Sequence, residues 1–434
     1  MDQEVTGKRL LILGGTRISC EIVRLAKEMG CFVGVVDYNP ISDSPAKQIA
    51  DESYEISVTD IDAIVELIKR EHYEGVIVGF ADAILPAYAE ICQKAGLPSY
   101  ATKKQLEVFT HKDLYKPLLR KYGIPTVDEY KVDISDIDRS VSKIAFPLLV
   151  KPADSAGARG ITICYNADEL KDALEKAKSF SHSGIVLVER YIEGREVTIN
   201  WLFVNGKYYL TCIANRHVKH NQEGVIPLPV GYTYPASITS FFQDNLEEKC
   251  KKMFREQGIQ NGTMFMQCKV ENGIPIIYDI GYRMTGTMEY TNMEDACGYN
   301  PNKMLIHFAL TGSMGEPNIV KRIDPYFGGR FGFNVSNLAA TGTISKLEGI
   351  EEVSNFPEVA RSVIAHYPGE TITEKMRGLL AQITVRTLGT VDDEKELYRS
   401  MKKIENTIKI ISTEGTLLNL PGIEPEDIEG YIAH

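Results

Sequence analysis

The chain has 434 residues, more than one hydrophobic core of ordinary size can hold, so we expect two or three packed domains. Hydrophobic residues make up 44% and charged residues 25% of the sequence, which excludes an extensively disordered chain. The formal net charge of -11 argues against nucleic acid and anionic membranes as partners, because such surfaces bind through lysine and arginine.

The spacing of the cysteines and the polarity of the first residues indicate where in the cell the protein is found. The eight cysteines are scattered singly without a C-x-x-C pair, which favours reduced thiols over a disulfide framework. Residues 1–8 lack the features of a signal peptide, and no apolar run approaches the roughly 20 residues of a membrane span. We therefore expect a cytoplasmic protein without a membrane partner.

Strands and helices alternate over residues 1–105. We expect apolar strands and amphipathic helices, in chain order, at residues 9–13, 32–36, 61–70, 75–78 and 85–95. This alternation predicts an α/β domain with a doubly wound parallel sheet, whose ligand edge lies at the carboxyl ends of its strands.

Small and acidic residues fall at those strand ends, namely Gly14, Gly15, Asp37 and Asp82. They are candidates for lining a ligand cleft. In the alternative interpretation the glycines only permit turns and the aspartates only cap helices.

The pattern becomes α+β from about residue 106. We expect its helices and strands at residues 112–122, 147–151, 167–177, 185–188, 196–203, 207–213, 263–270 and 274–280. We interpret residues 106–325 as a central domain of two α+β halves, with a lid at about residues 125–195. Residues 326–434 are then a small C-terminal domain with an amphipathic helix near residues 393–404.

Two lysines and a small-residue loop have the pattern of a phosphate site. Lys112 begins a helix, whereas Lys151 ends a strand and opens the loop of residues 155–160. The loop contains, among others, Ser155, Gly157 and Gly160. Its backbone N–H groups can approach a triphosphate while the lysines supply positive charge.

An apolar strand and the linker after it suggest a site for a nucleoside. The linker that could bond an adenine edge through its backbone consists of Glu189, Arg190, Tyr191 and Ile192. Glu196 follows closely enough to contact ribose hydroxyls. Together with the phosphate site, this segment indicates binding of ATP.

Gln267 and Asp279 fall on neighbouring strands of a predicted hairpin, and Arg283 follows four residues beyond Asp279. Two oxygen ligands that face each other can hold magnesium, because phosphate oxygens and waters complete its octahedron. A buried Asp279 without a partner would be costly, which favours a metal or arginine partner. A purely structural ion pair between Asp279 and Arg283 is the alternative.

Found together in this order, these features resemble the ATP-grasp superfamily, and the resemblance covers essentially the whole chain. The sequence is similar to the branch that contains biotin carboxylase, the carbamoyl-phosphate synthetase large subunit, and the purine-synthesis and amino-acid ligases. Residues 342–349 are similar to the C-terminal segment of this branch. The resemblance implies a doubly wound first domain, a central domain that clamps ATP between its halves, and a C-terminal domain.

The resemblance also assigns the nucleotide contacts by position. Lys112 and Lys151 match the two phosphate-contacting lysines, and residues 155–160 match the flexible glycine-rich loop. The linker of residues 189–192 matches the adenine contact, and Glu196 matches a ribose contact.

The predicted metal site resembles that of the family but differs from it at three positions. Gln267 and Asp279 take the places of two acids that bind Mg²⁺ or Mn²⁺, and Arg283 that of the arginine for the reacting carboxylate or the phosphoryl group. The first acid is usually Glu, the second is here the shorter Asp, and the Asn expected two residues later is Gly281. The predicted metal site therefore carries one negative charge less than usual.

The resemblance implies a ligase. A carboxylate would attack the γ-phosphate of ATP, giving ADP and an acyl phosphate that an amine then captures, with Lys151 and Arg283 as the catalytic residues. The partners would be small-molecule acids and amines, and the family also suggests a homodimer. Two alternatives stay open: activation of bicarbonate or formate, and a non-catalytic nucleotide-binding protein, which the departures at Gln267 and Gly281 motivate.

Two further segments, residues 217–220 and residues 224–235, could contribute to a metal site or a substrate site. The pair His217-x-x-His220 lacks a third ligand at a convincing spacing, which favours a solvated or substrate-facing pair over a metal site. Residues 224–235 are rich in proline, glycine and tyrosine, and predict a loop on the substrate side.

Overall fold

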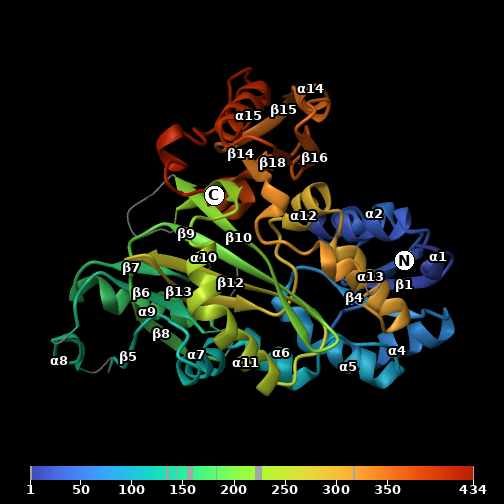
Figure 1. Cartoon of the computed structure of the whole chain (residues 1–434), viewed down its shortest axis with the longest axis horizontal. Helices are drawn as coiled ribbons and strands as arrows, with labels where there is room; N and C mark the ends of the chain where they lie inside the picture. Colours follow the sequence, from blue (N-terminus) through green and yellow to red (C-terminus); the bar gives the residue numbers. More distant parts are fainter. Residues whose placement is uncertain are drawn as a thin grey trace.

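The computed structural model describes residues 2–132, 136–142, 144–153, 160–181, 183–219, 227–315 and 318–433. Figure 1 shows three regions: a blue N-terminal unit, a teal lid with a sheet of its own, and a large central sheet capped by the red C-terminal unit. No helix in the described ranges is long and apolar enough to cross a membrane.

The N-terminal unit contains a parallel sheet. Its strands are β1 (Arg9–Leu13), β2 (Phe32–Asp37), β3 (Glu52–Glu55) and β4 (Gly75–Val78), in the order β3-β2-β1-β4. Its helices are α1 (Asp2–Val5), α2 (Cys20–Glu28), α3 (Pro45–Ile49), α4 (Ile61–Arg70) and α5 (Leu85–Ala95). The central strands are almost fully buried, as expected where helices cover a parallel sheet. The predicted parallel α/β arrangement is thus confirmed.

Two helices connect this unit to the lid. Helix α6 (Lys103–Thr110) begins at a capping box in which Thr102 and Gln105 bond each other's backbone N–H groups. Helix α7 (Lys112–Lys121) follows directly and has Tyr115, Lys116 and Leu119 on its buried side. The sequence predicted α7, whereas α6 was not predicted.

The lid is a small antiparallel sheet with one helix packed on it. Its strands are β5 (Glu129–Tyr130), β6 (Leu148–Pro152), β7 (Thr162–Cys164) and β8 (Val186–Arg190), in the order β5-β8-β6-β7. Helix α9 (Ala167–Phe180) packs Leu170 and Leu174 against Leu148 and Val188, and the short helix α8 (Ile137–Val141) lies beside α9. This cluster is separate from the main core of the protein.

An antiparallel sheet of eight strands forms the centre of the molecule. In chain order they are β9 (Glu196–Val204), β10 (Lys207–Lys219), β11 (Leu228–Tyr234), β12 (Gly262–Glu271), β13 (Ile274–Gly281), β14 (Phe331–Leu338), β16 (Val359–Ile364) and β18 (Ile383–Val391). Their order in the sheet is β13-β12-β9-β10-β11-β14-β18-β16. The domain boundary predicted at residues 325 and 326 falls between β13 and β14, two strands of this one sheet.

Strand β11 replaces most of the loop predicted at residues 224–235. All seven residues from Leu228 to Tyr234 are buried, and they pair with β10 and β14. The loop prediction was therefore wrong for these residues, whereas residues 224–226 lie outside the described ranges. Pro229 is tolerated because it stands opposite a register shift in β10, where a missing N–H breaks no regular ladder.

The remaining elements flank the large sheet. They are α10 (Thr239–Phe242), α11 (Glu248–Glu256), α12 (Glu289–Cys297), α13 (Pro301–Thr311), α14 (Ile350–Ser354) and α15 (Glu394–Thr407), with the strands β15 (Gly342–Glu348), β17 (Thr371–Ile372) and β19 (Lys409–Ser412). The three strands form a separate sheet in the order β17-β15-β19. Helix α15 packs on β14 and β18, whereas α13 returns to pack against β4 and α2 (Figure 1).

Candidate active site

Charged residues from three parts of the fold meet between the lid and the large sheet. Lys112 begins α7, Lys151 lies on β6, Glu189 lies on β8 and Asp279 lies on β13. Lys151 and Glu189 are buried, and their side chains are only 5% and 2% exposed. Because charges are expensive to bury unless they are paired, each of these groups has an opposite charge beside it.

The first pair joins α7 to the hairpin of the large sheet. The Nζ atom of Lys112 lies 3.4 Å from Oδ1 of Asp279, to which the hydroxyl of Tyr115 also donates a hydrogen bond of 3.2 Å. Although burial alone favours the neutral acid, the cations Lys112 and Lys151 keep the pKa of Asp279 below its ordinary value. Asp279 is therefore an anion at neutral pH, as a magnesium ligand has to be.

The second pair belongs to the lid. Nζ of Lys151 lies 2.9 Å from Oε2 of Glu189 and donates to the carbonyl oxygen of Tyr278 at 3.4 Å. The other carboxylate oxygen of Glu189 contacts Lys116, which also lies 3.0 Å from Glu129. Burial lowers the pKa of Lys151 to about 8, against the opposing effect of the Glu189 carboxylate.

The linker predicted to contact adenine continues from β8. The Glu189 backbone pairs within the lid sheet, and the N–H of Tyr191 donates to the carbonyl of Pro147 at 3.1 Å. Ile192 is buried. The guanidinium of Arg190 binds both carboxylate oxygens of Glu271, at 2.7 and 2.9 Å, which holds the lid to the large sheet. Nucleotide contacts by these residues stay a prediction.

Glu196, the predicted ribose contact, begins β9 with a side chain that is 2% exposed. Its carboxylate lies 2.8 Å from Nζ of Lys269 and also contacts the guanidinium of Arg216. The strand register places the three residues directly opposite one another on β12, β9 and β10. Glu196 thus has two cationic partners, and its ribose contact stays a prediction.

The two predicted metal ligands do face each other. Gln267 and Asp279 are direct cross-strand partners on β12 and β13, next to a register shift after Gln267. Among the described residues no group of three or more His, Cys, Asp or Glu side chains could hold a metal ion by itself. An amide oxygen and an ionised carboxylate are nevertheless sufficient where phosphate oxygens complete the octahedron, so the pair fits magnesium bound with a nucleotide.

Arg283 binds Asp82, one of the residues predicted to line a ligand cleft of the N-terminal domain. Its Nε and Nη2 atoms donate to the two carboxylate oxygens of Asp82, at 2.6 and 2.5 Å, and its guanidinium lies 5.0 Å from the centre of the Phe265 ring. The alternative of a structural pair between Asp279 and Arg283 is therefore wrong, because Asp279 pairs with Lys112. The contact to Asp82 brings the N-terminal sheet edge into the site.

Packing accounts for Gly281, where the family usually has Asn. Gly281 is the cross-strand partner of Phe265, and a Cβ atom built on Gly281 would collide with that ring. The phenyl ring thus occupies the space of the expected side chain and also contacts Arg283. Any side chain at position 281 would require the ring to move.

The predicted phosphate loop falls largely on residues 154–159, so Ser155 and Gly157 lie outside the described ranges. Gly160 is described, with φ of +73°. A Cβ atom there would lie 2.8 Å from Cβ of Phe180 and 3.0 Å from Cγ of Pro152. Glycine at position 160 thus has a local steric reason, and its phosphate contact stays a prediction.

His217, the first histidine of the predicted solvated or substrate-facing pair, is buried. His217 is 4% exposed, with Nε2 at 2.8 Å from the hydroxyl of Thr233 and its ring stacked on Tyr431. Burial lowers the pKa of His217 to about 4, so it is neutral at physiological pH. His220 lies outside the described residues.

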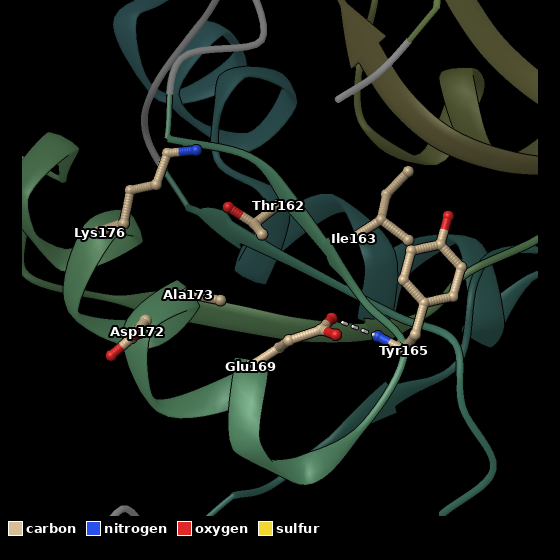
Figure 2. A pocket seen from close by; sticks show the side chains of 7 residues that line it. All are labelled: Thr162, Ile163, Tyr165, Glu169, Asp172, Ala173 and Lys176. Carbon is tan, nitrogen blue, oxygen red and sulfur yellow. Dashed lines mark hydrogen bonds between the residues drawn. The ribbon is translucent and has the colours of Figure 1, made fainter. Parts of the chain in front are cut away.

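The lid also has a cavity of about 460 Å³. Figure 2 shows its lining, which comes from strand β7, helix α9 and the turn between them and includes Thr162, Tyr165, Glu169 and Lys176. The Glu169 carboxylate accepts a hydrogen bond of 2.8 Å from the backbone N–H of Tyr165. None of the paired site residues lines this cavity, so we do not assign it to the nucleotide.

Sequence reasoning missed Lys116 and Glu129 of the cluster, and it placed Asp82 at the cleft without identifying its partner. The spacing between Lys116 and Lys112 could have indicated that Lys116 belongs to the site. Lys116 stands four residues after Lys112 on the same helix, and residues at this spacing share one helix face.

Part of this chain matches a known domain family, and longer stretches are similar to known proteins. Residues 144–289 match the model of a domain family described as the ATP-grasp domain. The C-terminal section of the carbamoyl phosphate synthase large chain from Aquifex aeolicus is 24% identical over 307 residues, covering 69% of this chain and 55% of that protein. The small subunit of 2-oxoglutarate carboxylase from Hydrogenobacter thermophilus is 31% identical over 204 residues, 43% of each chain. The chain thus spans about half the length of these relatives.

The fold is also that of solved proteins. The crystal structure of an L-amino acid ligase from Bacillus licheniformis superposes with a TM-score of 0.76 at 19% identity, covering 94% of this chain and 99% of that one. The two proteins therefore share the fold over nearly their whole length. Residues 144–289 of this chain are therefore an ATP-grasp domain, as the sequence resemblance predicted.

Proposed function

We propose that this chain is an ATP-dependent ligase that activates a carboxylate as an acyl phosphate and joins it to an amine, with release of ADP and phosphate. One observation carries the proposal: Lys112, Lys151 and Asp279 converge between the lid and the large sheet in a chain with an ATP-grasp domain. These are the cations and the anion that binding a triphosphate with magnesium requires.

The chain's own residues would act by position and charge. Lys112 and Lys151 would offset the charge of the phosphates, where preorganised cations contribute most to a phosphoryl-transfer transition state. Arg283, held by Asp82, would orient the reacting carboxylate through its remaining N–H groups. When bound, Mg²⁺ would neutralise phosphate charge from a position on Asp279 and Gln267.

The type of substrate is inferred from the named relatives. The solved L-amino acid ligase shares the fold over almost its whole length, which supports a carboxylate and an amine as the two substrates. A second candidate is activation of bicarbonate or formate. The 31% identity to a 2-oxoglutarate carboxylase subunit and 28% identity to a formate-dependent phosphoribosylglycinamide formyltransferase from Pasteurella multocida favour it.

A screen of ADP release with MgATP against paired acids and amines tests the proposal. A ligase should release ADP continuously and fastest when an acid and an amine are present together, because the amine consumes the acyl phosphate, whereas stimulation by bicarbonate or formate alone supports the second candidate. Lys151→Ala and Asp279→Ala should abolish the substrate-dependent release. Lys121→Ala is the matched control, because this lysine lies on α7 with a side chain that is 64% exposed. Full turnover in both site variants would refute the assignment.

A non-catalytic nucleotide-binding protein gives a different result. It would bind ATP tightly without magnesium in calorimetry and form no ADP with any member of the panel. We also propose a cytoplasmic location and small-molecule partners, which the eight free cysteines and the acidic charge support. Light scattering of the purified protein tests the predicted homodimer.

A further inference from the structure

Alternating charges run from the protein surface into the candidate active site. Arg120 lies 3.0 Å from Glu129, and Glu129 lies 3.0 Å from Lys116. Lys116 contacts Glu189, which lies 2.9 Å from Lys151. The side chain of Arg120 is 43% exposed, whereas that of Lys116 is fully buried. The series ends at Lys151, the lysine predicted to contact phosphate, whose side chain is 5% exposed.

Lys116 is an unusual residue to bury. An ammonium group loses its hydration on burial, and only paired carboxylates offset that loss. Its carboxylate partners are Glu129 on β5 and Glu189 on β8. Helix α7 places Lys112 and Lys116 one turn apart, so that the first meets Asp279 and the second meets Glu189.

Each oxygen of the Glu189 carboxylate has its own lysine. Oε1 contacts Lys116 and Oε2 contacts Lys151. A phosphate at Lys151 competes with Glu189 for the positive charge of the ammonium group, two of whose three N–H donors already face Glu189 and the carbonyl oxygen of Tyr278. Without Lys116, the buried Glu189 carboxylate would have to share its one remaining lysine with the incoming phosphates, and poorly compensated charges are costly in a protein interior.

We propose that Lys116 is a positioning residue for nucleotide binding: it keeps Glu189 paired through the second oxygen and thereby releases Lys151 to the phosphates. This role rests on the proposed function, because it requires that Lys151 binds ATP. Lys116 itself does not touch the nucleotide. It acts through Glu189, which competes with phosphate for Lys151.

The test is a double-mutant cycle on the dissociation constant of MgATP, measured by calorimetry with the full chain. Lys116→Met should weaken binding about tenfold or more, because Glu189 then has only Lys151 nearby among the site lysines. Glu189→Gln alone should tighten binding, since it removes the competitor for Lys151 while the backbone of residue 189, through which the linker is predicted to bond adenine, stays in place. Adding Glu189→Gln to Lys116→Met should restore most of the lost affinity, which a purely structural role of Lys116 would not produce.

Turnover provides a second readout. In the proposed ligase reaction, Lys116→Met should raise the KM for ATP much more than it lowers kcat, because Lys151 still reaches the phosphate once ATP is bound. Arg120→Gln is the matched control: it removes a cation from the same helix at the exposed end and should change the dissociation constant less than about twofold.

The results distinguish a failure of the proposed role of Lys116 from a failure of the proposed ATP-dependent function. Equal affinities of the wild type and Lys116→Met, or losses that simply add in the double variant, would overturn the role of Lys116 alone. A wild-type protein that does not bind MgATP would overturn the proposed function and this role with it. If Lys116→Met does not fold, as judged by circular dichroism, Glu189→Gln decides: a tenfold weakening in that variant contradicts the role.

Discussion

The affinity for ATP should fall as the pH rises from 7 to 9, because Lys151 loses its charge in this range. Burial, opposed by the Glu189 carboxylate and reinforced by the cations Lys116 and Lys112, lowers the pKa of Lys151 to about 8. The ammonium form binds phosphate, so binding is strongest below this pKa and is lost as the pH rises through it. With a pKa near 8, the ammonium fraction falls from about 90% at pH 7 to about 10% at pH 9.

The expected change in affinity follows from these fractions. If only the ammonium form binds, the dissociation constant of MgATP rises about tenfold between pH 7 and pH 9. Calorimetric titration with MgATP at constant ionic strength measures this constant directly. Ionic strength has to be fixed because screening also weakens phosphate contacts.

Lys151→Met is the control for this titration. It removes the titrating group, so its weaker binding should not depend on pH between 7 and 9. A wild-type dissociation constant that stays constant over this range would refute the reasoning. A midpoint near pH 8 that persists in Lys151→Met would also refute it, because another group would then be responsible.

Two further predictions concern Gly281 and Gln267, which replace the Asn and Glu usual at the metal site of the family. Gly281→Asn should lower the free energy of unfolding by about 1–3 kcal/mol in urea titrations, because the new side chain overlaps the Phe265 ring. In a Phe265→Ala background the same substitution should cost less than about 1 kcal/mol, and an equal cost in both backgrounds would contradict the clash. Gln267→Glu should lower the magnesium concentration for half-maximal ADP release by about three- to tenfold, since it restores the missing charge opposite Asp279. An unchanged magnesium dependence would place the metal elsewhere.

Much of the fold follows from local signals in the sequence. The strand at residues 9–13 and the helices at residues 61–70 and 85–95 were predicted with their observed bounds, because apolar periodicity and turn residues delimit them. The pairing of Gln267 with Asp279 was predictable for a related reason. A short turn between two strands fixes their register, and the register decides which side chains face each other.

Other features depend on contacts between distant segments. Lys116 and Glu189 are 73 residues apart, and Arg283 and Asp82 are 201 residues apart, so no local pattern indicates either pair. The buried strand β11 was missed because Pro229 and Gly231 disfavour strands by themselves. Pairing on both sides, with β10 and β14, overrides this preference.

The fate of the carboxylate oxygen atoms tests most directly whether this chain activates a carboxylate as an acyl phosphate. In an acyl phosphate, a carboxylate oxygen is bonded to phosphorus, and attack by the amine at carbon leaves that oxygen on the released phosphate. With an acid substrate identified by the ADP screen and labelled with ¹⁸O in its carboxylate, we predict one ¹⁸O atom in each phosphate released, measured by mass spectrometry. Phosphate without label, released at the same rate as ADP, would contradict activation of a carboxylate by this chain.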